Sequence, residues 1–311
     1  SDLTRGFACV TGAGNESGFR HHYPGRLSPD QAYEDVELRV ADSTAGFSME
    51  LWADVSELYT VGFVSPSGEV IERLPLAVGQ ETTVSFQLDA THIFISYQIT
   101  EASSGRFLAF LRFTAPAPGI WHIRVYPTLF VSGQFHIWLP MQEFLTEDTG
   151  FLRPDPDITI TDPGNAPLLL TVSTYNHVTG SLYIHSSRGF TATGQIKPDL
   201  AAPGVEVQGP GLPRQDGSTF SGSTREAISS SATSPLTRKT GSSVAAAIAA
   251  GAVASLFSWG FTQGNDLTLT SISVKSILIR GADRKEAFRY PNRQWGYGTL
   301  NLYRAFLLLR E

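Results

Sequence analysis

This chain of 311 residues has few charged side chains, and those it has are not clustered by sign. Only 17% of the residues are charged, no basic run occurs, and the formal net charge is -6 at pH 7. A nucleic-acid partner is therefore excluded, because such proteins carry a basic patch that attracts phosphates. Hydrophobic residues make up 41% of the chain, with 29 glycines and 18 prolines, which predicts a compact, turn-rich fold and argues against disorder.

Cysteine is almost absent, and neither a leader pattern nor a membrane-length apolar run is found. Cys9 is the single cysteine, so an internal disulfide is excluded, and its apolar neighbours predict a buried, inert thiol. No Cys/His spacing typical of a zinc site occurs, and we expect no metal or cofactor. The start of the chain lacks a charged-then-apolar leader, and we expect no membrane association.

One stretch organises the rest of the chain. It is an alanine-rich run from Thr240 to Leu256 that begins with a Gly/Ser cluster, which predicts a helix with a hydroxyl-rich start. Its faces are small and apolar nearly all round, so we expect burial on every side. A serine at such a helix N-terminus lies beside unpaired backbone N–H groups, which suits a nucleophile. Alone, the stretch is more typical of a core helix that its serines merely cap.

Three motifs, in order, give the stretch a context. Gly241–Ala247 resembles the nucleophile motif of subtilases, Gly-Thr-Ser-x-Ala-x-Pro, with Ser242 for threonine and Ala247 for proline. Lys197–Val205 resembles the segment before that motif, and Gly12–Glu16 resembles the strand end that carries the oxyanion asparagine. Near the C-terminus, Tyr290–Gly298 is most similar to clostridial subtilases of the spore-germination protease type.

The resemblance implies a serine endopeptidase that acts through an acyl-enzyme on Ser243. Asn15 and the Ser243 backbone N–H would stabilise the oxyanion. A protein or peptide is the implied substrate, by analogy a precursor that undergoes limited cleavage during germination. The substrate-binding residues implied are Thr11, Gly12, Ala13, Gly14, Gly241 and Ser242.

The family's chain order also implies what this sequence does not contain. In subtilases the triad aspartate and histidine both precede the oxyanion asparagine, so neither His21 nor His22 is expected to be the base. We expect these two histidines to have a loop or domain-junction role. The chain would then be the C-terminal part of a subtilase, inactive alone, whose partner is an N-terminal segment with the aspartate and histidine, and a possible propeptide.

Between the oxyanion segment and the nucleophile lies a region of different character. Ser243 follows Asn15 by 228 positions, whereas the family's ordinary spacing is well short of a hundred. The excess is about one small domain, and its eight short alternating runs, separated by turns, predict a β-sandwich. The resemblance implies an inserted jelly roll. The predicted strands are Val36–Val40, Phe47–Trp52, Val61–Val64, Thr83–Leu88, Ile93–Ile99, Arg106–Phe113, Gly119–Val125 and Gly133–Leu139.

The predicted fold is thus an α/β subtilisin-like catalytic part, mainly a parallel sheet with helices, interrupted by an all-β jelly roll. Residues 1–31 would carry the oxyanion segment, 32–141 the jelly roll, and 142–311 the nucleophile and the C-terminal helices. In the last part we expect strands at Ile158–Thr161 and Leu168–Ser173, and helices at Ile272–Gly281 and Leu302–Leu309.

Two other classes of function stay open. The first is a pseudoprotease that binds or signals without cleaving, although Ser243 and Asn15 are both retained. The second is a binding protein that acts through the jelly roll, where tryptophan and tyrosine side chains could form a sugar platform. His92, His122 and His136 lie in or beside the predicted strands, where histidines are more often structural than ligands.

Overall fold

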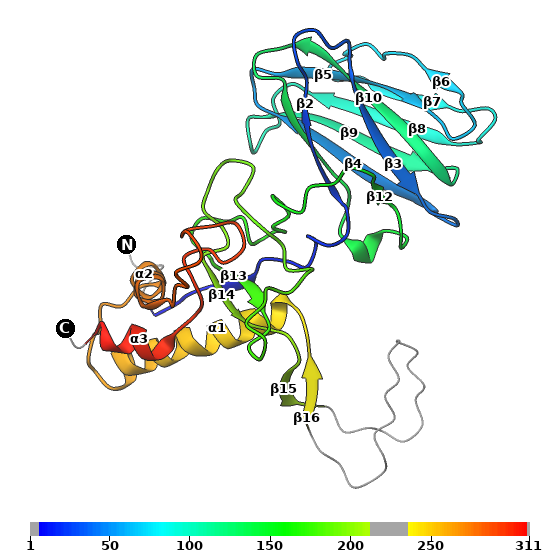
Figure 1. The fold of residues 1–311 in the computed structure, drawn as a ribbon. Helices are drawn as coiled ribbons and strands as arrows, with labels where there is room; N and C mark the ends of the chain where they lie inside the picture. The colour runs from blue at the N-terminus through cyan, green and yellow to red at the C-terminus, as the bar shows by residue number, and fades with distance from the viewer. Residues whose placement is uncertain (1–5, 212–235, 310–311) are drawn as a thin grey trace, which may run out of the picture. The chain divides into compact units, whose positions relative to one another are not determined.

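The computed structural model describes residues 6–211 and 236–309, which form two compact units. The α/β unit comprises Ser1–Gly14, Asp162–Ser186 and Ile196–Glu311, and the sandwich unit comprises Asn15–Thr161 and Ser187–Gln195. Figure 1 shows the ribbon of both units coloured along the chain.

A three-stranded parallel sheet forms the centre of the α/β unit. Its order is β1 (Val10–Gly12), β13 (Leu170–Tyr175) and β14 (Leu200–Pro203). Both parallel pairings place the strands' carboxyl ends at one edge, where sites of open α/β sheets gather. The other elements of this unit are the hairpin strands β15 (Val207–Pro210) and β16 (Leu236–Lys239), helix α1 (Ser242–Phe257) with the π-helical turn η2 (Ser258–Thr262), and helices α2 (Ser271–Gly281) and α3 (Leu302–Leu307).

Helix α1 packs one face on the sheet. Ala245, Ala249, Val253 and Leu256 are buried at helical spacing and join the core formed by the strands. The expectation of burial on every side is wrong, because the opposite face, which includes Ala247 and the residues near it, is exposed. An alanine gains little from burial, so a helix of small residues carries almost no information about which face turns inward.

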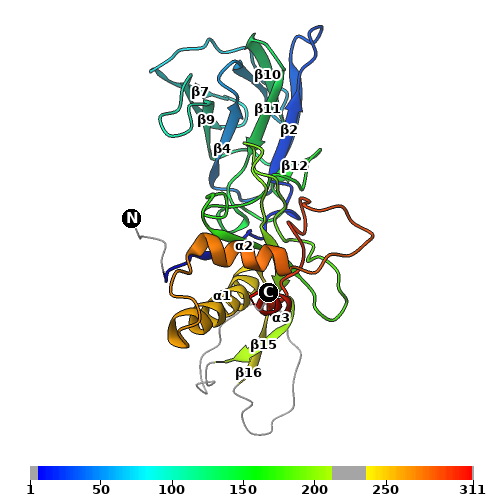
Figure 2. The same ribbon diagram turned by 90° about the vertical axis from the view of Figure 1, so that its left-hand side faces the viewer.

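The two C-terminal helices confirm the predicted apolar segments. Helix α2 begins with a capping box, in which the Thr270 side chain accepts from Ser273 N and Ser273 reaches back to Thr270 N. Asn301 caps α3 by accepting from Arg304 N at 2.9 Å. Figure 2 shows α2 lying across α1, with α3 beside them.

The sandwich unit consists of two antiparallel sheets around one apolar core. The sheet orders are β12-β3-β10-β5-β6 and β2-β11-β4-β9-β8-β7. Trp121, Phe113 and Phe86 form edge-to-face aromatic contacts in the core. A short 3-10 turn, η1 (Gln142–Phe144), follows the last long strand. The strands are β2 (His22–Arg26), β3 (Glu34–Val40), β4 (Gly46–Ala53), β5 (Leu58–Val64), β6 (Val70–Ile71), β7 (Glu81–Ser85), β8 (His92–Gln98), β9 (Phe107–Thr114), β10 (Gly119–Leu129), β11 (Gln134–Trp138) and β12 (Gly150–Phe151).

All eight predicted strands have a counterpart in these sheets, and their jelly-roll connectivity stays a prediction. The domain bounds predicted at residues 31 and 141 differ from the bounds of the compact units, which divide the chain after Gly14 and after Thr161. Strand β2 pairs with β11, and β12 pairs with β3, so the segments before and after the predicted insertion complete its sheets. The strand expected at Ile158–Thr161 does not form, because the backbone of this segment bonds to an irregular segment at Arg188.

Candidate active site

The start of α1 lies at the carboxyl edge of the parallel sheet. Gly204, just after β14, donates its N–H to Tyr175 O at the end of β13 (3.1 Å), and Gly241 N donates to Gly204 O (2.9 Å). A Cβ on Gly204 would lie 2.6 Å from Thr174 Cγ2 and 2.8 Å from Gly241 O. A larger residue there would push strand and helix apart, so this glycine sets how closely α1 approaches the sheet.

Ser242 and Ser243, adjacent at the helix start, have opposite environments. Ser242 is buried, and a Cβ placed on Gly12 at the end of β1 would lie 2.7 Å from its Cβ and Oγ. Ser243 is exposed, and its hydroxyl forms no hydrogen bond within the described residues. Close packing of β1 against Ser242 therefore leaves Ser243 as the hydroxyl that a substrate can reach.

The helix start also supplies N–H groups. Gly241, with φ 150°, is the N-cap residue and provides no side-chain cap, so the expected hydroxyl cap is absent at this position. Its carbonyl accepts from Val244 N at 3.1 Å and Ala245 N at 3.3 Å. The Ser243 N–H precedes these bonds and has no acceptor within the helix. A donor of this kind, beside the Ser243 hydroxyl and at the positive end of a 16-residue helix, is suited to stabilise an anion.

The predicted strand-end residues lie in or directly after β1. Ala13 continues the pairing of β1, donating its N–H to Val172 O at 2.8 Å, and its side chain is fully buried. Thr11 and Gly14 are half-buried. Asn15 is half-buried and belongs to the sandwich unit. Its oxyanion role and the substrate-binding roles stay predictions.

His21 and His22 are both buried in the sandwich unit. His21 Nδ1 lies 2.9 Å from Glu16 Oε2, and His22 Nδ1 lies 3.2 Å from the carbonyl of Asp155. Both imidazoles thus have partners inside that unit; His22 lies in strand β2 rather than in the expected loop.

A buried charge cluster supports the sheet at the start of β14. The Asp199 carboxylate, 3% exposed, accepts from Lys197 Nζ at 2.9 Å, Lys275 Nζ at 2.8 Å and Thr171 N at 2.8 Å. Burial lowers the pKa of Lys197 from its usual value, and the nearby Asp199 charge opposes that shift. Lys197 also donates to Leu169 O. Only the family resemblance drew attention to Lys197–Val205, and the charge cluster itself was not predicted. The one local signal for it is the pair of charges, Lys197 and Asp199, on either side of a proline before an apolar strand.

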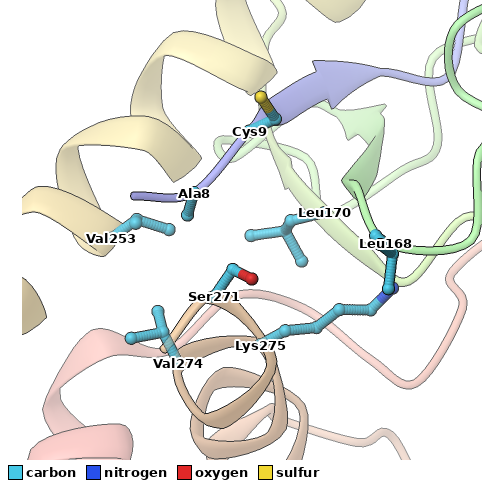
Figure 3. Close-up of a pocket in the computed structure, with 8 residues that line it drawn as sticks. All are labelled: Ala8, Cys9, Leu168, Leu170, Val253, Ser271, Val274 and Lys275. Carbon is cyan, nitrogen blue, oxygen red and sulfur yellow. The ribbon is translucent and has the colours of Figure 1, made fainter. Parts of the chain in front are cut away.

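A small hollow lined by Cys9, Leu170, Val253 and Lys275 lies where β1 and β13 begin (Figure 3). Its volume is about 10 Å³, enough for about one water molecule, so it cannot hold a substrate side chain. The expectation of a buried thiol is wrong, since Cys9 is exposed. It lies just before a strand whose outer edge is unpaired in the described part of this unit, so apolar neighbours did not imply burial.

By length and composition alone, the continuous helical stretch Ser242–Thr262 could cross a membrane, contrary to the expectation that no run approaches that length. One face of the stretch packs on the parallel sheet, 33% of its apolar window is buried, and core helices pass the same test.

Comparisons with known proteins find similarity to subtilases. The sequence model of the subtilase family matches residues 154–298, which include Ser243. The structure of the Clostridium perfringens CspB protease matches with a TM-score of 0.82 and 27% identity, over 99% of this chain and 61% of that chain. This chain therefore spans less than two thirds of that protease.

Other matches are more distant. The prenylagaramide maturation protease PagA matches with 21% identity and a TM-score of 0.36, over 49% of this chain and 46% of that chain. The patellamide maturation protease PatA matches with 22% identity and a TM-score of 0.35, over 50% of this chain and 47% of that chain. No curated protein matches. Residues 154–298 of the chain are thus similar to the subtilase family, and almost the whole chain is similar in structure to the CspB protease of Clostridium perfringens.

Proposed function

We propose that this chain supplies the nucleophile of a subtilisin-like serine endopeptidase. The observation that carries the proposal is the placement of Ser243: exposed, without a hydrogen-bond partner in the described residues, and at the N-terminus of α1 on the carboxyl edge of a parallel sheet. The subtilase match over residues 154–298 supports the same assignment.

Ser243 Oγ attacks the scissile carbonyl, the peptide nitrogen leaves with a proton, and water then hydrolyses the acyl-enzyme. The Ser243 backbone N–H and the Asn15 side-chain amide hold the oxygen that becomes negative. One such donor contributes about 3–4 kcal/mol to the transition state, because it is already oriented when the charge develops.

A serine hydroxyl needs a base, and the motif order of the family puts the histidine and its aspartate on a segment before Asn15. The surface of the α/β unit supports a partner segment of this kind. The face of α1 that carries Ser243, Ala247, Ala250 and Ala254 is exposed, and the outer edge of β1 has no paired strand in the described part of this unit. Both are next to the nucleophile and both can pack against further sheet and helix.

Without that segment we expect no activity, and with it we expect limited cleavage of a protein precursor. A pseudoprotease is the second candidate. One observation favours it: no base forms a hydrogen bond with Ser243 among the described residues, as expected for a protein that does not cleave.

Active-site labelling tests the proposal. We expect a fluorophosphonate to label the full-length gene product at Ser243, located by mass spectrometry, and to leave this chain alone unlabelled. Ser243→Ala abolishes the label, whereas Ser242→Ala, at the buried neighbour, retains it. A folded full-length protein that stays unlabelled would refute the endopeptidase and leave the pseudoprotease.

A further inference from the structure

We propose that His22, His136 and Trp138 form an acid-sensitive clamp, which holds the connector Asp155–Thr159 onto the sandwich at neutral pH and releases it in acid. The clamp residues lie on the adjacent strands β2 and β11 of the six-stranded sheet. The chain passes into the α/β unit at Asp162, directly after this connector.

Three hydrogen bonds attach the connector to the two strands. His22 Nδ1 lies 3.2 Å from Asp155 O, Asp155 N donates to His22 O at 3.0 Å, and Trp138 Nε1 donates to Ile158 O at 3.0 Å. His22 is 1% exposed, so water cannot replace these partners while the connector is in place. The side chain of His22 is therefore the centre of the attachment.

The second histidine fixes the first. His22 Nε2 and His136 Nδ1 are 2.9 Å apart, and both rings stack against Trp138 with centroid distances of 5.0 and 5.2 Å. Since His22 Nδ1 must donate to the carbonyl of Asp155, the neutral pair has one arrangement: His136 Nδ1–H donates to the bare His22 Nε2.

The number of protons on the two facing ring nitrogens decides whether the clamp stays closed. One added proton leaves a hydrogen bond between the rings, because one of the two facing nitrogens still carries a lone pair. A second proton places N–H against N–H between two cations 2.9 Å apart, and the pair must separate. Because His22 cannot turn away while it holds Asp155, separation disturbs the connector.

The charged groups around the pair come from four segments. The Asp155 carboxylate on the connector acts on His22 through its charge, and Asp157 acts on it only through its backbone. His136 faces His22 on β2, Arg106 before β9, Asp54 after β4 and Asp155. Its direct strand neighbours, Pro24 and Trp52, carry no charge.

The balance of these groups keeps the pair neutral at pH 7. Arg106 and Asp54 form an ion pair at 3.1 Å and so largely offset one another. Burial lowers the pKa of His22, and burial together with the His22 and Arg106 charges lowers the pKa of His136 to about 4. A histidine with a lowered pKa stabilises the closed state above pH 6.5, and this contribution is lost as the pH falls toward 4.

Release would reach further than the connector itself. Thr159 N donates to Arg188 O at 2.9 Å and Arg188 N donates to Thr159 Oγ1 at 3.0 Å, which ties the connector to the segment where the chain returns to the sandwich. Glu16, near the point where the chain first enters the sandwich unit, donates its N–H to Ser187 Oγ at 2.9 Å, next to Arg188.

Hydrogen exchange by mass spectrometry on this chain, at pH 7 and pH 5, tests the clamp. After correction for intrinsic rates, we expect exchange of the hydrogen-bonded amides of residues 155–159 to rise roughly 20-fold from pH 7 to pH 5. This follows from a pKa of His136 of about 4 in the closed state and about 6.5 when the clamp is released. The amides of β10, in the other sheet, should keep their protection.

A matched pair of variants isolates the cause. His136→Gln can still donate to His22 but cannot titrate, so its pH-dependent rise should disappear. His122→Gln, at a histidine paired with Asp35 on the five-stranded sheet, should behave as the unmodified chain does. An equal rise in His136→Gln, no rise in the unmodified chain, or simultaneous loss of protection in β10 would each overturn the proposal. If His136→Gln does not fold, NMR titration of the ring of His22 decides: an ordinary pKa near 6.5 overturns the clamp.

Discussion

Replacing Asp199 by asparagine should destabilise the α/β unit far more than the same substitution at an exposed ion pair. Asp199 pairs with both Lys197 and Lys275, and the Lys197 side chain is 2% exposed. The substitution would leave two ammonium groups facing a neutral amide. Breaking a buried ion pair by removing one partner costs about 3–5 kcal/mol, because the remaining charge stays buried without compensation.

The control is Asp283→Asn. Asp283 pairs with Arg304 at 2.9 Å, but their side chains are 49% and 59% exposed, so water solvates both charges and we expect a loss below about 1 kcal/mol. Lys275→Met should lie between the two, since the Lys275 side chain is 19% exposed.

Native-state hydrogen exchange is the appropriate assay, because a chain of two compact units need not unfold in one step. The Thr171 amide, which donates to Asp199, and the amides of β14 report on this cluster. Equal losses for Asp199→Asn and Asp283→Asn, or a loss below about 1 kcal/mol for Asp199→Asn, would refute the reasoning.

Two further predictions concern the corner around β1. Gly12→Ala should lower the free energy of unfolding by about 1–3 kcal/mol and reduce fluorophosphonate labelling of the full-length protein, because the new methyl group would lie 2.7 Å from Ser242 and displace the start of α1. The control is Gly209→Ala, where, apart from its chain neighbours, the new methyl group meets no atom of the described residues within 4 Å. Labelling and stability of Gly12→Ala equal to those of the control would contradict this packing. Cys9, being exposed, should react with a maleimide in the native chain as fast as in the denatured chain, within about tenfold; a thiol that reacts only after denaturation would contradict its placement.

Local pattern was enough to predict most of the secondary structure. Alternation of apolar and polar residues located the eight long strands of the sandwich, because each strand has one face in the core and one in solvent. Helices α1 and α2 were located by composition and spacing. A family motif predicted the nucleophile at Ser243, next to Ser242; the family model matches the region around them, and the role of Ser243 stays a prediction.

Tertiary structure decided what short segments and small residues do. Strand β12 has only two residues, and β2 contains Pro24 and Gly25, which are typical of turns; only their pairing with β3 and β11 makes these segments strands. An alanine-rich helix has no preferred face, so the sheet selects which side of α1 is buried.

The same holds for single residues whose environment comes from distant parts of the chain. Lys197, Asp199 and Lys275 become one charge cluster, and His22 and His136 become one proton-sharing pair, only when the fold brings their elements together. Sequence determined which groups are present and where the regular elements run. Packing between elements distant in the chain determined that Ser243, and not Ser242, faces solvent. The reason is that Gly12, which has no side chain, lets the start of α1 approach the end of β1 closely.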